Sequence, residues 1–398
     1  MQAKDQILKL TGKVQHYAWG GHTYIAQLLG TDNPQHLPMA EYWMGAHPSA
    51  PSQVQVHDKA KSLHTLIAND PVKFLGAEVN ERFHELPYLL KVLDVEQMLS
   101  IQVHPSRQEA IEGYEREEAA GIPIDAPHRN YKDKNHKPEV MVALSEFWLL
   151  HGFKETGALE QVLTEVPAFH FLQPTFKNHG YYGLYKTVME LPQQKVDEIL
   201  RPLVEGLLAD KKGYSKVQPE YWTVKLFEHN TNLTGIDRGI FSIYFFNIVQ
   251  AQPGEAVFQG AGIPHAYLQG QNVELMANSD NVLRGGLTPK HIDVPELLKH
   301  TLFEGITPNV LKGERNGAEN NYPCPVDDFG ISTIHLGNQQ EYHATSRSAE
   351  IYVVIDGEAT IEPLDVRVKK GEAFFVLPGT SYTLKASEPS ILYKAFVP

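Results

Sequence analysis

Two distant segments of the chain repeat the same order of turn and strand, and this repeat constrains the fold most strongly. Residues 254–267 run from a Gly-Glu turn through an apolar run to Pro264-His265, and residues 371–382 follow the same order with a small difference in length. Paired hairpins of this kind are typical of small double-sheet jelly rolls. The first copy carries His265 where the second has Thr380 or Ser381, so only the first is expected to bind a metal in this way.

Short apolar runs broken by Gly, Pro and Asp predict buried strands on both sides of a different central region. In the first part of the chain the predicted strands cover residues 86–93, 99–103, 140–143 and 147–150. After the central region they cover residues 241–249, 256–259, 265–268 and 273–277, with a turn at Gly270, and the tail from Ile331 onward reads as strands and turns.

The central region has helical periodicity instead. Apolar residues recur at helical spacing from Leu159 to Val166 and from Val196 to Leu207, where Pro202 could introduce a kink. A further helix is expected at residues 293–301.

We therefore expect a mainly β protein with a helical insertion. The expected domains are a catalytic jelly roll at 1–153 and 235–305, a helical domain at 154–234, a linker at 306–330, and a C-terminal roll without metal ligands at 331–398.

Charge and cysteine content exclude several classes of protein. The 398 residues carry a formal charge of −13, which argues against a nucleic-acid surface. Residues 128–137 nevertheless form a local basic patch, which could also be a solvated loop. Cys324 is the only cysteine, the N-terminal segment lacks an apolar signal core, and the run 241–249 is about half a membrane span. We expect a cytoplasmic monomer that does not enter a membrane.

Polar residues with metal-ligand spacing form the candidate site. Gln102 and His104 are two residues apart, which places both side chains on one face of a strand, and His265 and Tyr267 repeat the spacing. Glu139 adds a carboxylate. Two imidazoles, a carboxylate and an amide suit a divalent transition ion, with zinc first and manganese, cobalt or iron as alternatives. With 19 histidines in the chain, the spacing by itself does not establish the site.

A carboxylate and two cations follow in the same segment. Glu274 could act as a general base or orient a metal ligand, or it could be an exposed strand carboxylate. Arg284 precedes Gly285-Gly286, and its guanidinium fork suits an oxyanion or phosphate, to which Lys290 could add a point charge. The alternative is that both cations are simply solvated.

Together these segments resemble a known family. Gln102-Val103-His104-Pro105, His136-Lys137-Pro138-Glu139 and residues 264–290, which read PHAYLQGQNVELMANSDNVLRGGLTPK, are similar to type I phosphomannose isomerases. Tyr17-Ala18-Trp19-Gly20 and residues 40–48 match the family as well. The resemblance extends over nearly the whole chain and is weakest at 155–235 and in the tail.

The resemblance implies a cupin-type double jelly roll with an α-helical domain and one zinc ion per chain, held by Gln102, His104, Glu139 and His265. It also implies a small phosphosugar substrate and the reversible conversion of D-mannose 6-phosphate to D-fructose 6-phosphate through a cis-enediol(ate). Arg284 would stabilise the enediolate, and Ser100 and Lys290 would contact phosphate or substrate. The remaining residues expected at the substrate are Lys91, Tyr267, Asp280, His47 and Trp19, of which His47 and Asp280 would assist ring opening.

Several questions stay open at this level. The group that moves the proton could be Glu274, Lys137 or a water on the metal. A non-catalytic sugar-phosphate-binding cupin is the main alternative, and it would lack part of the metal set or the cations. An iron-dependent cupin oxygenase is a third reading, which a set of one glutamine, one glutamate and two histidines fits poorly.

Overall fold

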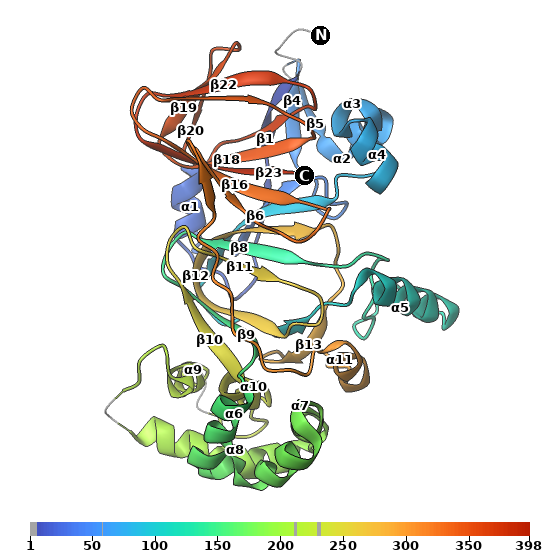
Figure 1. The fold of residues 1–398 in the computed structure, drawn as a ribbon, viewed down its shortest axis with the longest axis vertical. Coiled ribbons are helices and arrows are strands. Elements are labelled where there is room, and N and C mark those ends of the chain that lie inside the picture. Colours follow the sequence, from blue (N-terminus) through green and yellow to red (C-terminus); the bar gives the residue numbers. More distant parts are fainter. Residues whose placement is uncertain (1–5, 58, 211–212, 229–231) are drawn as a thin grey trace.

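The computed structural model describes residues 6–57, 59–210, 213–228 and 232–398. Two groups of residues lie outside these ranges. One is residues 1–5, which belong to the N-terminal segment that lacks an apolar signal core, and the other is three short stretches within the predicted domains. The C-terminal strands, a central group of strands and a group of helices follow one another along the long axis (Figure 1). Strands make up 33% of the chain and helices 28%. The protein is therefore a mixed α/β protein rather than mainly β, because helices outside the predicted insertion add to the helical content.

The central strands form one antiparallel sheet system built around β12. Its members are β2 (Lys13–Gln15), β3 (Glu41–Gly45), β6 (Tyr88–Val95), β7 (Ile101–Val103), β8 (Glu139–Ala143), β9 (Phe147–Phe153), β10 (Phe246–Ala251), β11 (Ala256–Gln259), β12 (His265–Ala277) and β13 (Leu283–Gly286). β12 pairs with β7 and β9 through its first half and with β6 and β8 through its second half. It therefore joins the strands on which most of the predicted site residues lie.

The expected turn at Gly270 is wrong, because β12 is a single continuous strand. Gly270 has φ 125°, and a Cβ there would lie 2.6 Å from the carbonyl oxygen of Glu146. Between Tyr267 and Gln269 two residues of β12 oppose one of β9, which is a β-bulge. Glycine thus lets the strand change partners where the sequence suggested that it ended.

A second sheet combines both ends of the chain. It contains β1 (Ile7–Thr11), β4 (Gln53–Val56), β5 (Lys59–Ser62), β14 (Glu314–Asn316), β15 (Glu319–Tyr322), β16 (Gly330–Leu336), β18 (Glu350–Asp356), β21 (Ala373–Val376) and β23 (Ser390–Phe396). A four-stranded sheet of β17 (Glu341–Thr345), β19 (Glu358–Glu362), β20 (Val366–Lys369) and β22 (Ser381–Ala386) accompanies it. β1 pairs with β21, and the predicted linker 306–330 includes the β14–β15 hairpin.

The two repeated segments of the sequence begin with similar backbone turns. Gly254 and Gly371 have nearly the same left-handed φ, 84° and 83°. Each precedes a short strand, β11 or β21, and the next strand along the chain is β12 or β22. A residue with a side chain would be strained at either turn.

Helices lie mainly at the end of the molecule opposite the C-terminal strands (Figure 1). This region contains α6 (Thr156–Glu165), the 3₁₀ helix η2 (Pro167–Leu172), α7 (Gln173–Glu190), α8 (Gln193–Ala209), α9 (Pro219–Lys225) and α10 (Gly239–Phe245). The other helices are α1 (Tyr24–Leu29), α2 (Leu63–Asn69), α3 (Pro71–Leu75), α4 (Ala77–Phe83), α5 (Arg107–Ala119) and α11 (Val294–His300). α6, α8 and α11 confirm the three predicted helices, and α8 continues through Pro202.

The strand predicted at residues 241–249 is wrong in its first half. α10 occupies that part, and β10 begins only at Phe246. All seven residues of α10 are buried, so no polar face interrupts the apolar run and no helical period can be seen in the sequence.

Removing the Phe241 side chain should therefore destabilise the protein strongly. Phe241 is fully buried and packs against Phe169, with ring centroids 5.5 Å apart. We expect Phe241→Ala to lower the free energy of unfolding by about 3–5 kcal/mol through the cavity it leaves. Urea denaturation measures the change. Phe171→Ala, at a side chain that is 45% exposed, is the control and should cost far less. Equal effects of the two changes would contradict the placement of α10.

Candidate metal centre and active site

Three buried side chains converge inside the central sheet. His104 follows β7, Glu139 begins β8 and His265 begins β12. The Oε1 atom of Glu139 lies 3.4 Å from Nε2 of His104, and its Oε2 atom lies 3.3 Å from Nε2 of His265. One potential ligand atom from each residue lies within 4.8 Å of the others. Gln102 is the cross-strand partner of His265 on one side and of Arg284 on the other, which places it between this cluster and the cation.

Local sequence explains why His104 is held so firmly. β7 ends at Val103, and Ser106 caps the start of α5. In this capping box the Ser106 hydroxyl accepts the Glu109 backbone N–H, and the Glu109 carboxylate accepts the Ser106 backbone N–H. His104 therefore sits between the end of a strand and a capped helix, and its side chain is completely buried.

Backbone carbonyl groups orient both imidazole rings. Nδ1 of His104 lies 2.8 Å from the carbonyl oxygen of Asn281, and Nδ1 of His265 lies 2.9 Å from that of Ile263, so each Nδ1 is assigned the hydrogen and donates it. The two Nε2 atoms are buried and have no hydrogen-bond partner in the described part of the chain. Tetrahedral ligands at about 2.0–2.1 Å from zinc would lie roughly 3.3–3.4 Å apart. The measured nitrogen–oxygen separations match this value, so the residues fit a zinc ion.

Electrostatics keeps these groups in the protonation states that a metal needs. Burial lowers the pKa of His104 to about 4, which leaves the ring neutral at pH 7. Burial alone would raise the pKa of Glu139, but Lys137, whose Nζ lies 3.3 Å away, and His104 hold it well below its ordinary value. The site therefore presents an anionic carboxylate beside the neutral imidazole of His104, with the ring of His265 on its other side.

A buried network of charges adjoins this cluster. The Nζ atom of Lys91 donates a hydrogen bond to Oε2 of Glu274 at 3.0 Å and lies 3.4 Å from Oε2 of Glu41. The Tyr267 hydroxyl donates to Oε1 of Glu274 at 2.8 Å, and the Trp43 indole N–H donates to Glu41. Burial opposes the charge on Lys91, but Glu274 and Glu41 outweigh it and raise its pKa. Both oxygens of Glu274 thus accept hydrogen bonds. Burial raises the pKa of this carboxyl group.

A cavity of 630 Å³ opens beside these groups and continues into a small inner cavity of 60 Å³. The predicted residues that line the outer cavity are Trp19, Lys91, Ser100, Gln102, Lys137, Asp280, Arg284 and Lys290, and those that line the inner one are Lys91, Gln102, Lys137, Glu139, His265, Tyr267 and Glu274. His47 lines neither cavity, but its Nε2 atom lies 3.4 Å from the Asp280 carboxylate. The structure thus gathers the predicted residues in one place.

Two cations in the outer cavity are free to bind an anion. The charged groups of Arg284 and Lys290 make no hydrogen bond or ion pair with any described residue. Burial lowers the pKa of Arg284, and burial together with Arg284 lowers the pKa of Lys290, because no carboxylate compensates for either charge. An anionic group on a ligand would supply this compensation.

Glu41, Trp43, Tyr17 and Met276 also line the cavity. Sequence reasoning placed Tyr17, Glu41 and Trp43 in segments that match the family, but it gave none of the four residues a role in the site. Glu41 and Trp43 lie two residues apart on β3, and Trp43 is the cross-strand partner of Lys91. The sequence did show a charged residue two positions from an aromatic one in an otherwise apolar strand. Only the pairing of β3 with β6 shows that these two residues lie beside Lys91.

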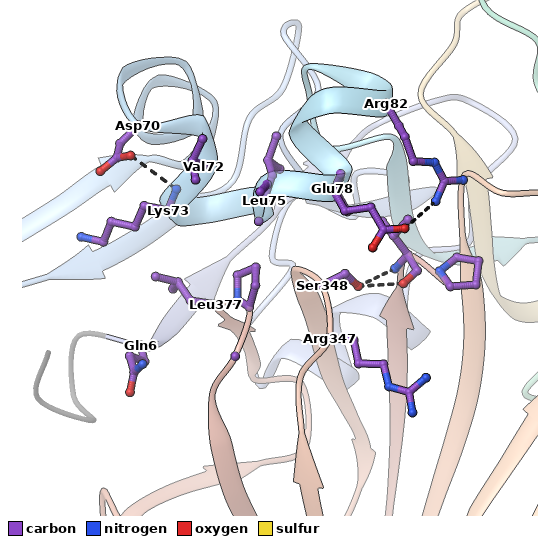
Figure 2. A pocket seen from close by; sticks show the side chains of 17 residues that line it. Gln6, Asp70, Val72, Lys73, Leu75, Glu78, Arg82, Arg347, Ser348 and Leu377 are labelled. Carbon is purple, nitrogen blue, oxygen red and sulfur yellow. Dashed lines mark hydrogen bonds and ion pairs between the residues drawn. The ribbon is translucent and has the colours of Figure 1, made fainter.

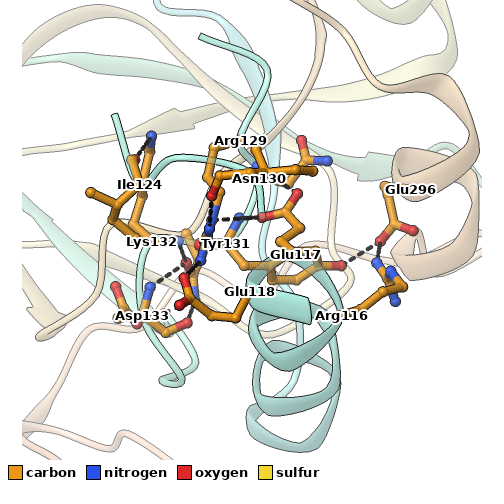
Figure 3. A network of polar contacts seen from close by, with 12 residues as sticks. Arg116, Glu117, Glu118, Ile124, Arg129, Asn130, Tyr131, Lys132, Asp133 and Glu296 are labelled. Atoms are coloured by element: carbon orange, nitrogen blue, oxygen red, sulfur yellow. Dashed lines mark hydrogen bonds and ion pairs between the residues drawn. The ribbon is translucent and has the colours of Figure 1, made fainter. Parts of the chain in front are cut away.

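The predicted basic patch at residues 128–137 is not an open patch. Arg129 is buried, donates to Glu118 at 2.6 Å and lies 3.0 Å from Glu117 of α5 (Figure 3). The Tyr131 hydroxyl donates to Glu296 of α11 at 2.5 Å, and Arg116 contacts the same carboxylate at 2.8 Å. The segment leading to Lys137 and Glu139 is therefore held between two helices by neutralised charges.

A larger pocket of 820 Å³ lies elsewhere, between α3 and α4 and the C-terminal strands (Figure 2). Lys73, Arg82 and Arg347 are among its lining residues, and none of the predicted site residues lines it. Pocket size therefore does not locate the candidate site, whereas convergent polar groups do.

A buried histidine pair, a buried carboxylate and two cations without a described partner beside one cavity are the features of a metal-dependent site for a small anionic molecule. Comparison with known proteins is consistent with this class. Residues 7–156 match the family model for the catalytic domain of type I phosphomannose isomerase. Over 384 residues the chain is 41% identical to the mannose-6-phosphate isomerase of Escherichia coli K12, covering 94% of this chain and 95% of the relative.

Solved structures agree. A mutant phosphomannose isomerase from Salmonella typhimurium superposes with a TM-score of 0.88 at 35% identity, covering 98% of this chain and 99% of the other. A zinc-bound mannose 6-phosphate isomerase superposes with a TM-score of 0.86 at 36% identity and the same coverage. The chain belongs to the type I phosphomannose isomerase family.

The contacts of Glu296 should make the free energy of unfolding depend on pH in the acid range. A hydrogen bond from His300, together with Tyr131 and Arg116, lowers the pKa of Glu296 to about 2 against the effect of burial. A carboxylate whose pKa is depressed by folding stabilises the protein above its unfolded pKa, about 4.3, and loses this contribution as the pH falls toward 2.

We therefore expect Glu296→Gln to lower the free energy of unfolding by roughly 1 kcal/mol at pH 7, after solvent screening, and by progressively less below pH ~4.5. Urea denaturation with a chelator present, at several pH values, measures this difference without interference from metal. Glu304→Gln, at an exposed residue without a described partner, is the control. A difference that does not change with pH would contradict the assignment.

Proposed function

We propose that the protein interconverts D-mannose 6-phosphate and D-fructose 6-phosphate with the aid of one zinc ion. The observation that carries this proposal is the pair of unpartnered Nε2 atoms facing the Glu139 carboxylate, beside a cavity that contains two free cations. In this reading His104, Glu139 and His265 hold the metal, and the neighbouring amide of Gln102 completes the set. The relatives that match nearly the whole chain are named as enzymes of this reaction.

The chemistry needs a proton to move between two neighbouring carbons. In the open-chain sugar, the proton on C2 is removed, a cis-enediol(ate) forms, and a proton returns to C1 while the C2 hydroxyl becomes the carbonyl. A bound zinc ion supplies a Lewis acid that stabilises negative charge on the sugar oxygens. Arg284 lies where its guanidinium can donate charge-assisted hydrogen bonds to the same oxygens or to the phosphate.

The contacts favour Lys137 over Glu274 as the group that carries the proton. Both oxygens of Glu274 already accept hydrogen bonds, from Tyr267 and Lys91. Lys137 lines both cavities, and Glu139, at 3.3 Å, is the one described residue with which its amine forms an ion pair. Glu274 and Tyr267 would then position Lys91, while Ser100, Lys290 and Trp19 would contact the sugar phosphate and Asp280 with His47 would assist ring opening.

The finer description of the fold is part of the same proposal. We infer two cupin-type jelly rolls, at 1–153 with 235–305 and at 331–398, separated by a helical domain at 154–234 and a linker at 306–330. The similar glycine turns at Gly254 and Gly371 support the relation between the rolls. No metal-binding group of histidine, cysteine or carboxylate residues other than the one at Glu139 occurs in the described ranges, which supports a C-terminal roll without metal.

We further propose a cytoplasmic monomer that binds no nucleic acid. A single cysteine and a charge of −13 support this. None of the described helices has the length and apolar character needed to cross a bilayer.

Chelation tests the function directly. Purified protein should convert mannose 6-phosphate to fructose 6-phosphate, lose this activity on prolonged treatment with a chelator, and regain it when zinc is added. A protein that keeps zinc but shows no conversion would favour a non-catalytic sugar-phosphate-binding cupin instead. Oxygen uptake supported by iron would favour an oxygenase.

Single substitutions should separate metal binding from catalysis. We expect His265→Ala and Gln102→Ala to abolish activity because zinc is lost, whereas Arg284→Ala should retain zinc and lower kcat by about 10²-fold or more. Zinc content by elemental analysis and steady-state kinetics provide the two readouts. Arg315→Ala, at an exposed arginine in the β14–β15 hairpin, is the control and should change neither. Loss of zinc in Arg284→Ala, or full turnover, would show that the roles are assigned wrongly.

A further inference from the structure

The segment that carries Arg284 and Lys290 is held by one carboxylate from a distant part of the chain. Oδ1 of Asp237 accepts hydrogen bonds from the backbone N–H groups of Leu287 at 2.8 Å and Gly239 at 2.7 Å. Its Oδ2 atom accepts from the N–H of Thr288 at 3.0 Å. Asp237 thus ties residues 287–288 to the first turn of α10.

The backbone of this segment is strained and closely packed where Asp237 holds it. Leu287 has φ 55°, a left-handed value that costs a side-chain-bearing residue roughly 1 kcal/mol or more. A Cβ on Gly286 would lie 2.6 Å from the Cα atom of Gly239, and a Cβ on Gly239 would lie 2.7 Å from the Leu287 nitrogen. Two glycines are therefore needed for the two backbones to meet, and strain of this kind persists only where the surroundings enforce it.

The same segment forms one wall of the outer cavity. Arg284, Leu287, Thr288, Pro289 and Lys290 all line it. Neither cation forms an ion pair with a residue in the described part of the chain, so the backbone between them has to fix their positions. The Thr288 hydroxyl also accepts the N–H of Lys290 at 3.1 Å, which connects the Asp237 contacts to that cation.

We propose that Asp237 is a positioning residue for recognition of the substrate's anionic group. Its carboxylate does not touch the substrate. It accepts three N–H groups and so places Arg284 and Lys290 at the spacing that a phosphate requires. This inference rests on the proposed function, since it takes the phosphosugar as the ligand of these two cations.

The helical region offers a matched control. Asp197 of α8 is half-buried like Asp237, and its carboxylate also accepts backbone N–H groups, from Gly235 at 2.9 Å and Ile236 at 2.8 Å. These contacts are made to the two residues that directly precede Asp237, and they do not involve the cavity wall. Replacing Asp197 should therefore disturb local structure without moving the cations.

We expect Asp237→Ala to raise the KM for mannose 6-phosphate roughly tenfold or more, with zinc content unchanged. Asp237→Asn keeps an oxygen acceptor for Gly239 and Leu287 but turns an NH₂ group toward the Thr288 N–H, so it should give an intermediate rise and serves as the variant if the alanine protein does not fold. Asp197→Ala should leave KM within about twofold of the unsubstituted protein.

A second readout does not depend on turnover. Calorimetric titration of the zinc-loaded protein with inorganic phosphate should show binding weakened by a factor similar to the KM change in the Asp237 variants and unchanged in Asp197→Ala. Unaltered KM and phosphate affinity in Asp237→Ala, or equal losses in Asp197→Ala, would overturn the proposal. If the unsubstituted protein does not convert mannose 6-phosphate, the proposed function fails, while the phosphate titration still decides the role of Asp237.

Discussion

The bulge in β12 is the constraint on which the arrangement of the site depends. Side chains alternate between the two faces of a strand, so residues at odd and even positions normally point in opposite directions. His265 and Tyr267 are odd and Glu274 is even, yet the Tyr267 hydroxyl bonds the Glu274 carboxylate. The extra residue between Tyr267 and Gln269 shifts the alternation by one. The side chains of His265 and Glu274 therefore both line the inner cavity.

The charged groups of Lys91 and Glu139 can be buried inside the sheet because each lies beside groups that compensate for its charge. Lys91 lies between Glu274 and Glu41, and Glu139 lies between two imidazoles and Lys137. Removing one member of such a set leaves an uncompensated buried charge, which is far more costly than removing an exposed pair. The exceptions in the cavity are Arg284 and Lys290, which have no partner for their charge among the described residues, and this is the reason for proposing that they bind an anion.

Contacts with neighbouring helices hold the residues to which we assign the chemistry. α5 begins with a capping box directly after His104, the segment before Lys137 is clamped by Glu117 and Glu296, and the Arg284 segment is docked on α10. These supports come from helices outside the sheet. The helical elements thus act as a frame for the site, in addition to forming a core of their own.

Local spacing and long specific segments were enough to predict the residue types of the candidate site, the family, most central strands and three of the helices. The sequence could not determine that residues 241–245 form a helix, since a helix buried on all sides has no visible period. Nor could it show the continuity of β12, the burial of Arg129 or the place of Glu41. Those features depend on which strands pair and which charges meet, and contacts between residues far apart in the chain exist only once the tertiary structure has formed.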